Sequence, residues 1–457
     1  MTADICKLII GAVVPIISGY LILEIILFRR MMLGFLEKLA LAYGTGIGML
    51  TLLMFYLSLL KVRFTFSNIT LSLILTVVLF ISFFAKRGKP RGFLAQKQSI
   101  CLSFVDKLLI VVIALVSLYV LFQALVTPLV DWDSWAIYGF KAKVFYLEKK
   151  VPLDFFKDAT KSYSHFDYPL LVPLAEAWIH ICLNNWNDQL AKIIFPLYFI
   201  SLILIFYYGL KYFSNRRPAL FFTSFLVTIP QLFYMGSSGY ADLPLLFYYF
   251  TSVIFLFRAY HNDLDGDLLT ISSIFAGFSA WTKNEGWAVS LFNILILLLI
   301  MLIQGRLNRR NLIILIRYAL VVLFIAAPWF WFKNSLGLRN EVINNNLNMA
   351  DIPGNLKRFP VILAWMGRNM ILLKSWNLLW LFSAIIMIAN FRKIITPPLL
   401  FISLALILYL GGGILLYIVA PHDITYYLSS TFDRFLLHMV PLILFLDGLL
   451  IFERERR

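Results

Sequence analysis

Charged residues are scarce in this chain of 457 residues: they make up 14% of it, and Asp and Glu number 24 against 40 Lys and Arg. A soluble domain is about 25% charged. The composition therefore excludes two or three soluble domains, which the length alone would permit.

Cysteine is scarce too. Cys6, Cys101 and Cys182 lack metal-ligand spacing, and we expect buried free thiols. A Walker loop, a GxGxxG turn and a Ser-His-Asp signature are missing, so ATP-driven transport is not indicated.

Hydrophobic residues are abundant and make up 61% of the chain. Apolar runs close to the ~20 residues that span a bilayer recur from end to end. The first run, 5–28, lacks a basic start and a small-residue cleavage site, so we read it as a span and not as a cleavable signal. The sequence predicts an all-α polytopic membrane protein with about 13 transmembrane helices: 5–28, 36–60, 67–85, 107–127, 189–210, 218–235, 241–258, 268–283, 286–304, 312–333, 372–391, 396–419 and 435–452.

Basic residues, which give a formal net charge of +16, gather between the apolar runs. Clusters at 29–38, 86–91, 211–217, 306–310, 392–393 and 454–457 follow the positive-inside rule, so these segments are expected in the cytoplasm. No nucleic-acid partner is needed to explain the charge. Residues 128–188, 334–371 and 420–434 then face outside. We predict a multi-pass protein of a bacterial plasma (inner) membrane, with its functional face toward the outside or periplasm.

The outer segment 128–188 opens with two aspartates, Asp131 and Asp133, where a long apolar run ends. In an extended segment both side chains point the same way. They could share a divalent cation, or one could act as a general base. Alternatively, Asp133 caps a helix that begins at Ser134. That helix, 134–150, is expected to be amphipathic and to lie in the headgroup layer. A second helix is expected over 167–183.

Further polar groups recur at predicted outer span ends. His165 and Asp167 stand in a polar loop, and Asp242 precedes Pro244 at a span start, where helix capping alone would explain it. Lys283 and Glu285 form a charged pair between two spans. They could neutralise each other in a turn, or the charged pair could bind phosphate or an acceptor. Because these polar groups recur at the same outer edge, we predict substrate-binding residues at His165, Asp167, Asp242, Lys283 and Glu285.

Two arginines are also candidates for phosphate binding. Arg434 begins the final span at headgroup depth, where a guanidinium suits a lipid phosphate; snorkelling without a ligand is the alternative. Arg368 stands near another outer span end. The last outer loop also holds His422, Asp423 and His438.

The order of these patches resembles a known superfamily. "DYPLLVPL", "WNDQLAKIIFPLYFIS", "SNRRPAL", "YADLPLLFYYF" and "AWTKNEGW" follow one another after the acidic motif. This order is similar to that of the GT-C superfamily of polyprenyl-phosphate-sugar glycosyltransferases, in the branch of aminoarabinose transferase and the protein O-mannosyltransferases. The resemblance covers about residues 107–304. It implies that residues 1–98 are additional N-terminal transmembrane helices and that 99–457 form a GT-C-like catalytic module.

The resemblance also implies roles. Asp133 takes the place of the catalytic aspartate, and the additional Asp131 leaves open which acid is the base. Lys192 stands where Arg is usual, and Asp242 and Lys283 match the family's acid and lysine motifs. The implied partners are a polyprenyl-phosphate sugar donor, a glycan, lipid or protein acceptor, and membrane lipid. No cofactor is implied beyond an optional divalent cation at Asp131 and Asp133. The alternatives are a transporter or flippase of a lipid-linked or anionic solute, and an O-antigen polymerase or ligase.

Overall fold

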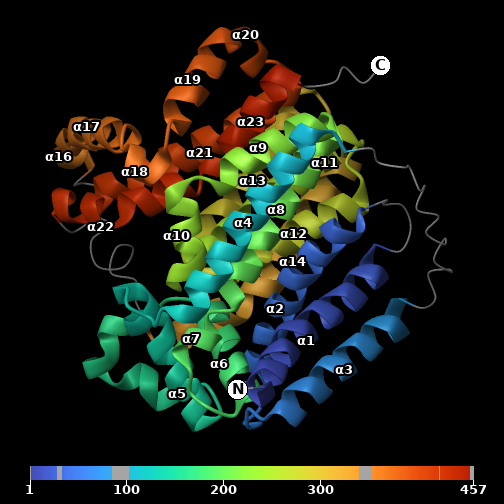
Figure 1. Ribbon diagram of the computed structural model, residues 1–457, viewed down its shortest axis with the longest axis vertical. Helices are drawn as coiled ribbons and strands as arrows, with labels where there is room; N and C mark the ends of the chain where they lie inside the picture. Colours follow the sequence, from blue (N-terminus) through green and yellow to red (C-terminus); the bar gives the residue numbers. More distant parts are fainter. Residues whose placement is uncertain (1, 28–32, 85–101, 339–351, 421–422, 453–457) are drawn as a thin grey trace.

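The computed structural model describes residues 2–27, 33–84, 102–338, 352–420 and 423–452. Within these ranges the chain is helical and forms no strand, as predicted for an all-α protein. The long helices are α1 (Thr2–Ile26), α2 (Phe35–Leu59), α3 (Phe66–Phe84), α4 (Phe104–Val126), α8 (Ile194–Phe213), α11 (Asp242–His261), α12 (Gly266–Thr282), α13 (Glu285–Ile303), α14 (Arg309–Ser335), α21 (Pro397–Val419), α22 (Ile424–Leu437) and α23 (Val440–Phe452). They form a bundle with its outer-loop helices gathered at one end (Figure 1).

The predicted number of spans is not confirmed. In the described ranges ten helical stretches are long and apolar enough to cross a membrane, or eleven if one bent pair counts as a span. That pair, α9 (Arg216–Val227) and α10 (Pro230–Ser238), bends by 65° where Pro230 begins the second helix. The segment 372–391 holds only an 11-residue apolar helix, α19 (Leu379–Ala389). The segment 268–283 forms α12, which has 17 residues and is not among the ten.

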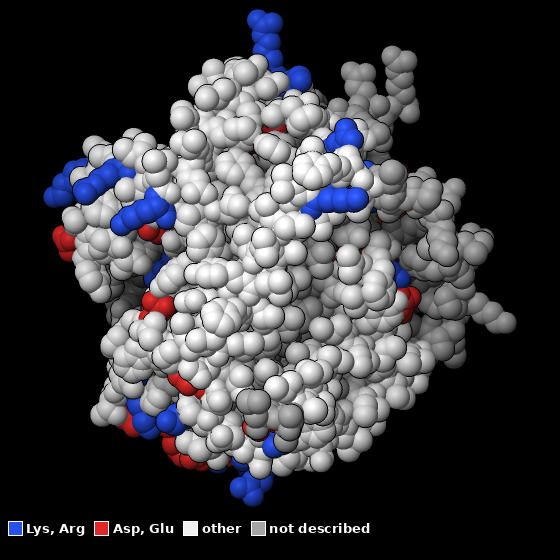
Figure 2. Space-filling view, viewed as in Figure 1, with Lys and Arg blue, Asp and Glu red and all other residues white. Residues whose placement is uncertain are grey.

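A broad central part of the surface is almost free of charge in the space-filling view, and charged side chains lie toward its margins (Figure 2). This pattern fits a protein that exposes apolar side chains to lipid. Cys6 lies on the exposed side of α1, so the expectation of a buried thiol is wrong there. Cys182 is buried as expected, and Cys101 lies outside the described residues.

The N-terminal helices belong to the packed bundle. Gly19 and Gly46 allow α1 and α2 to approach closely, since a Cβ on Gly46 would lie 1.8 Å from the carbonyl oxygen of Pro15. In α2 the Tyr43 hydroxyl donates to the carbonyl of Ile194, over 2.7 Å. Helices α1 and α2 therefore help to position α8, and the boundary at residue 98 stays a prediction.

The outer loop 128–188 is ordered by short helices. A π-helix, η2 (Asp133–Gly139), leads into α5 (Phe140–Glu148), and α6 (Leu171–Leu183) follows the 3-10 turns η3 (Leu153–Lys157) and η4 (Ala159–Ser164). The helix expected over 134–150 is therefore present as one continuous segment, and its first part has π geometry. Ser134 and Lys141, one near each end of this π-helical part, are both buried.

Candidate functional site

A cavity of about 780 Å³ opens where the outer loop meets the membrane bundle. Its walls come from η2 and η4, the start of α11, the turn between α12 and α13, and helices α21 and α22. Six of the residues predicted as site residues line it: Asp133, His165, Asp242, Lys283, Glu285 and Arg434. The structure therefore brings together side chains that lie up to 301 positions apart in the sequence.

Asp242 is the centre of the charged network in this cavity. It is 1% exposed, and its two carboxylate oxygens face different cations. Lys283 Nζ lies 3.0 Å from Oδ1, and Arg434 Nη1 lies 3.5 Å from Oδ2. The same Arg434 nitrogen also donates to Asp133 Oδ2. Asp242 makes no side-chain cap on α11 within the described structure, so its conformation is set by these charge-assisted contacts.

Lys283 is held from two sides. It follows the last residue of α12, and its Nζ lies 3.0 Å from both Asp242 Oδ1 and Glu285 Oε1. Burial opposes its charge, but the two carboxylates prevail and raise the pKa of Lys283 above its ordinary value. Lys283 and Glu285 do neutralise each other in the turn, yet the contact with Asp242 points the ammonium into the cavity.

Two further cavity residues were not among the predicted site residues. His438 Nε2 lies 3.6 Å from Asp242 Oδ1, and its Nδ1 lies 2.6 Å from the Tyr409 hydroxyl. Tyr409 is buried and stacks on Tyr249 and Phe435. Tyr409 lies within an apolar run, and nothing in the sequence indicates that its hydroxyl faces a site. His438 was noticed only as part of a polar loop.

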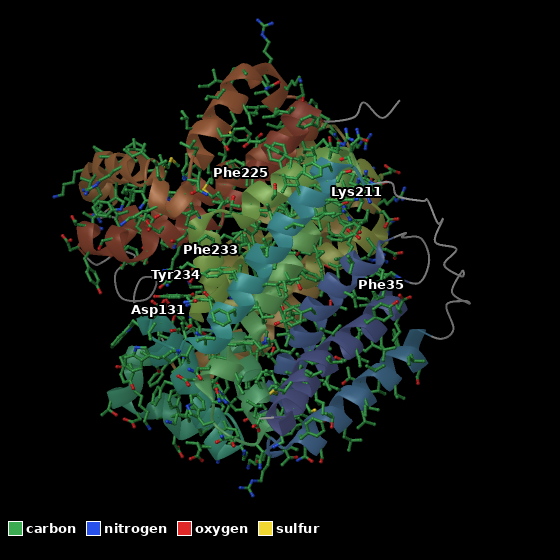
Figure 3. All side chains as sticks on the ribbon, viewed as in Figure 1. Phe35, Asp131, Lys211, Phe225, Phe233 and Tyr234 are labelled. Atoms are coloured by element: carbon green, nitrogen blue, oxygen red, sulfur yellow. The ribbon has the colours of Figure 1, made fainter. Side chains whose placement is uncertain are left out.

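Asp131 and Asp133 contact different partners. Asp131 Oδ1 accepts a 2.6 Å hydrogen bond from the Tyr234 hydroxyl (Figure 3), and Asp131 is not among the residues that line the cavity. Asp133 faces Arg434 and does not cap the start of η2 in the described structure. Among the described residues no group of three or more His, Cys, Asp or Glu side chains is arranged to hold a metal ion. The arrangement gives the shared divalent cation no support.

The remaining predicted residues lie around the cavity or away from it. The His165 ring lines the cavity and stacks on Tyr168, with ring centroids 4.9 Å apart. Asp167 is buried and accepts a 2.6 Å hydrogen bond from Asn284, which ties the outer loop to the turn that holds Lys283. Arg368 is exposed on α17 (Phe359–Met370) and lies over the ring of Trp365, outside the cavity.

Two buried lysines fix the outer loop. Lys141 donates to the carbonyl of His165 over 2.6 Å, and burial lowers the pKa of Lys141 to about 7, although Asp167 opposes this shift. Lys192 Nζ lies 2.8 Å from Thr127 Oγ1 and 3.2 Å from the carbonyl of Ser237. Lys192 therefore joins the end of α4 to α10, beside the cavity and not in it.

Comparison with protein-family models gives no match, and comparison with curated proteins gives none. Comparison with solved structures gives matches. The fold is similar to that of ArnT from Cupriavidus metallidurans bound to undecaprenyl phosphate, with a TM-score of 0.50 and 15% identity. The same protein in the apo state gives a TM-score of 0.50 and 14% identity. Each match covers 75% of this chain.

The chain spans about 60% of the length of these ArnT structures. At this level of identity the likeness concerns the fold alone. The predicted resemblance to the GT-C superfamily, in the branch of aminoarabinose transferase, is confirmed as a resemblance of fold: the chain is a multi-pass, all-helical membrane protein with a GT-C-like architecture.

Proposed function

We propose that this protein is a membrane glycosyltransferase that moves a sugar from a polyprenyl-phosphate donor to an acceptor at the outer face of the membrane. The observation that carries the proposal is the cavity in which Arg434 contacts Asp133 and Asp242 while Lys283 contacts Asp242. These two carboxylates and two cations lie together at one end of a bundle whose sides expose apolar side chains. The likeness to an ArnT structure bound to undecaprenyl phosphate supports the same reading.

Asp133 is proposed as the general base. Its side chain is 17% exposed and lines the cavity, so an acceptor hydroxyl can reach it. Its carboxylate takes the hydroxyl proton as the acceptor oxygen attacks the anomeric carbon. The bond from that carbon to the phosphate oxygen breaks, and the electron pair leaves with the polyprenyl phosphate. A single base opposite the leaving group gives inversion at the anomeric carbon.

Lys283 and Arg434 are proposed to hold the donor phosphate. A polyprenyl phosphate is already a weak base, so it needs charge stabilisation more than a proton as it leaves. Both cations are preorganised by carboxylates, and Arg434 presents a planar fork suited to phosphate oxygens. Arg368, exposed outside the cavity, is kept only as a candidate for contact with the lipid surface.

We propose that the acceptor binds against the aromatic side chains with which the outer loop lines the cavity. Trp132 and Tyr163 line the cavity beside His165. Aromatic faces next to polar groups suit sugar rings, so a glycan, a glycolipid or a glycosylated protein fits this wall. We place the enzyme in a bacterial plasma (inner) membrane, with the cavity toward the outside or periplasm, on the strength of the positive-inside pattern.

The function is tested by comparing cells that carry the wild type or Asp133→Asn. The variant keeps the shape of the side chain and removes its basicity. Mass spectrometry of lipid extracts should show a polyprenyl-phosphate sugar that accumulates in the variant, together with loss of one modified acceptor. Purified wild-type protein added to the variant's extract should then release undecaprenyl phosphate. Movement of the lipid across vesicle membranes with no change in its covalent structure would contradict the proposal and favour a flippase.

A further inference from the structure

A second cavity, of about 500 Å³, lies between α12 and α14, away from the proposed active site. It is lined at the start of α12 by Gly266 and Thr270 and on α14 by Arg310, Arg317 and Tyr318. Helix α12 begins at Gly266 and ends one residue before Lys283. Its 17 residues therefore place the two cavities about 25 Å apart along the bundle, at opposite ends of this helix.

Two arginines give this cavity an unbalanced positive charge. Arg310 and Arg317 are seven residues apart on α14, so they share a face and their backbones are about 10 Å apart. Within the part of the chain that the structure describes, neither guanidinium has an ion pair or a hydrogen bond. The acids next to the lining residue Gly266 are Asp265, which accepts from the backbone of Asp267 and Leu268 at the start of α12, and Asp267; neither is among the residues that line the cavity.

Arg317 lies about 12 Å along α14 from its start at Arg309, within a helix that is long and apolar enough to span a membrane. Its exposed neighbours on α14 are apolar: Ile313 is 42%, Ile316 49% and Leu320 58% exposed. An unpaired charge on such a face is costly unless it reaches water or an anion. Arg310, one residue beyond the start of α14, extends the positive charge from Arg317 to the membrane surface. The cavity between them can hold a headgroup whose tails lie along Ile313 and Leu320.

The chemistry on the walls suits a phosphate. Guanidinium groups pair with phosphate oxygens in two-pronged geometry. Arginine pockets between transmembrane helices on the cytoplasmic side are suited to anionic lipid headgroups. We propose that this cavity binds the phosphate headgroup of an anionic lipid in the cytoplasmic leaflet; the site does not depend on the glycosyltransferase proposal.

The experiment measures lipid binding by the full-length protein purified in a neutral detergent. Short-chain phosphatidylglycerol is titrated, with phosphatidylcholine as the neutral reference, and the melting temperature and apparent Kd are recorded. The double variant Arg310→Gln/Arg317→Gln is compared with Arg309→Gln. Arg309 is a matched control, because it is exposed on the same first turn and is not among the residues that line the cavity.

Phosphatidylglycerol should raise the melting temperature of the wild type and of Arg309→Gln. In the double variant the apparent Kd should rise by about tenfold or more, because two charge-assisted contacts are lost. Equal weakening in Arg309→Gln would overturn the proposal, since general surface charge would then explain binding. Unchanged binding in the double variant would also overturn it. A parallel titration with inorganic phosphate separates the sources: protection equal to that of the lipid would make the ligand a soluble phosphate and overturn the lipid assignment.

Discussion

Arg434 is the residue whose removal should disturb the proposed active site most. One guanidinium nitrogen of Arg434 contacts both Asp133 and Asp242. The substitution Arg434→Ala therefore leaves two carboxylates close together without the cation between them. Breaking one partner out of a buried ion pair costs about 3–5 kcal/mol. Asp242 keeps Lys283, and the Asp133 side chain is 17% exposed, so we expect a smaller loss than this, about 2–3 kcal/mol of unfolding free energy.

The assay is thermal unfolding in nanodiscs, with and without undecaprenyl phosphate. Arg434→Lys keeps the charge and loses the planar fork, so its stability and its affinity for undecaprenyl phosphate should fall between those of wild type and Arg434→Ala. Arg368→Ala is the matched control, since Arg368 is exposed and lies outside the cavity. If Arg434→Ala melts like wild type and binds undecaprenyl phosphate with unchanged affinity, the central role of Arg434 is refuted.

Three other perturbations test the arrangement. Asp133→Asn should lower turnover by orders of magnitude, whereas Asp131→Asn, which loses its charge but keeps an oxygen that can accept from Tyr234, should keep most of it; the reverse ranking, measured by product release, would move the base to Asp131. Burial lowers the pKa of Lys141 to about 7, so between pH 7 and its ordinary value the unfolded chain binds more protons and stability rises with pH, by at most about 1.4 kcal/mol per unit. Lys141→Met should flatten that slope in melting curves, and an unchanged slope would exclude Lys141 as its source. A single cysteine at the exposed Ser162 should be labelled by an impermeant reagent in intact cells; labelling only after lysis would invert the topology.

The helical architecture was predictable because length and apolarity decide it. Where the pattern is interrupted, prediction failed for identifiable reasons. Pro230 breaks one expected span into two helices that bend by 65°. The expected span 372–391 yields only a short helix, after Asn377 takes up a positive φ of 52°. In both places local backbone chemistry overrides an apolar run, and hydropathy averaged over a window does not register it.

The site was predictable in its parts and not in its contacts. Asp133, Asp242 and Arg434 were each noticed because polar groups recur at the predicted outer span ends. That Arg434 bridges the other two depends on how α22 packs against η2 and α11, which no local pattern encodes. Tyr409 and His438 were not among the predicted site residues for the same reason. Tyr409 lies in an apolar run, and only the structure shows that its hydroxyl lies 2.6 Å from Nδ1 of His438.

The charge balance of the cavity leads to a last prediction about Glu285. Three carboxylates, Asp133, Asp242 and Glu285, surround the two cations Lys283 and Arg434, so a donor phosphate must compete for them. In the proposed mechanism Asp133 is the base, and Asp133 and Asp242 both fix the position of Arg434.

Glu285 is different, because its side chain is 38% exposed and it contacts only Lys283 among the cations. An exposed ion pair contributes about 0–1 kcal/mol. Glu285→Gln should therefore free Lys283 at little cost in stability and tighten the binding of undecaprenyl phosphate, by up to about fivefold. The measurement is an equilibrium titration in nanodiscs, with the exposed Glu148→Gln on α5 as the control for a general change in charge. Equal or weaker affinity in Glu285→Gln would mean that Lys283 does not meet the phosphate, and the phosphate-binding role would fall to Arg434 alone.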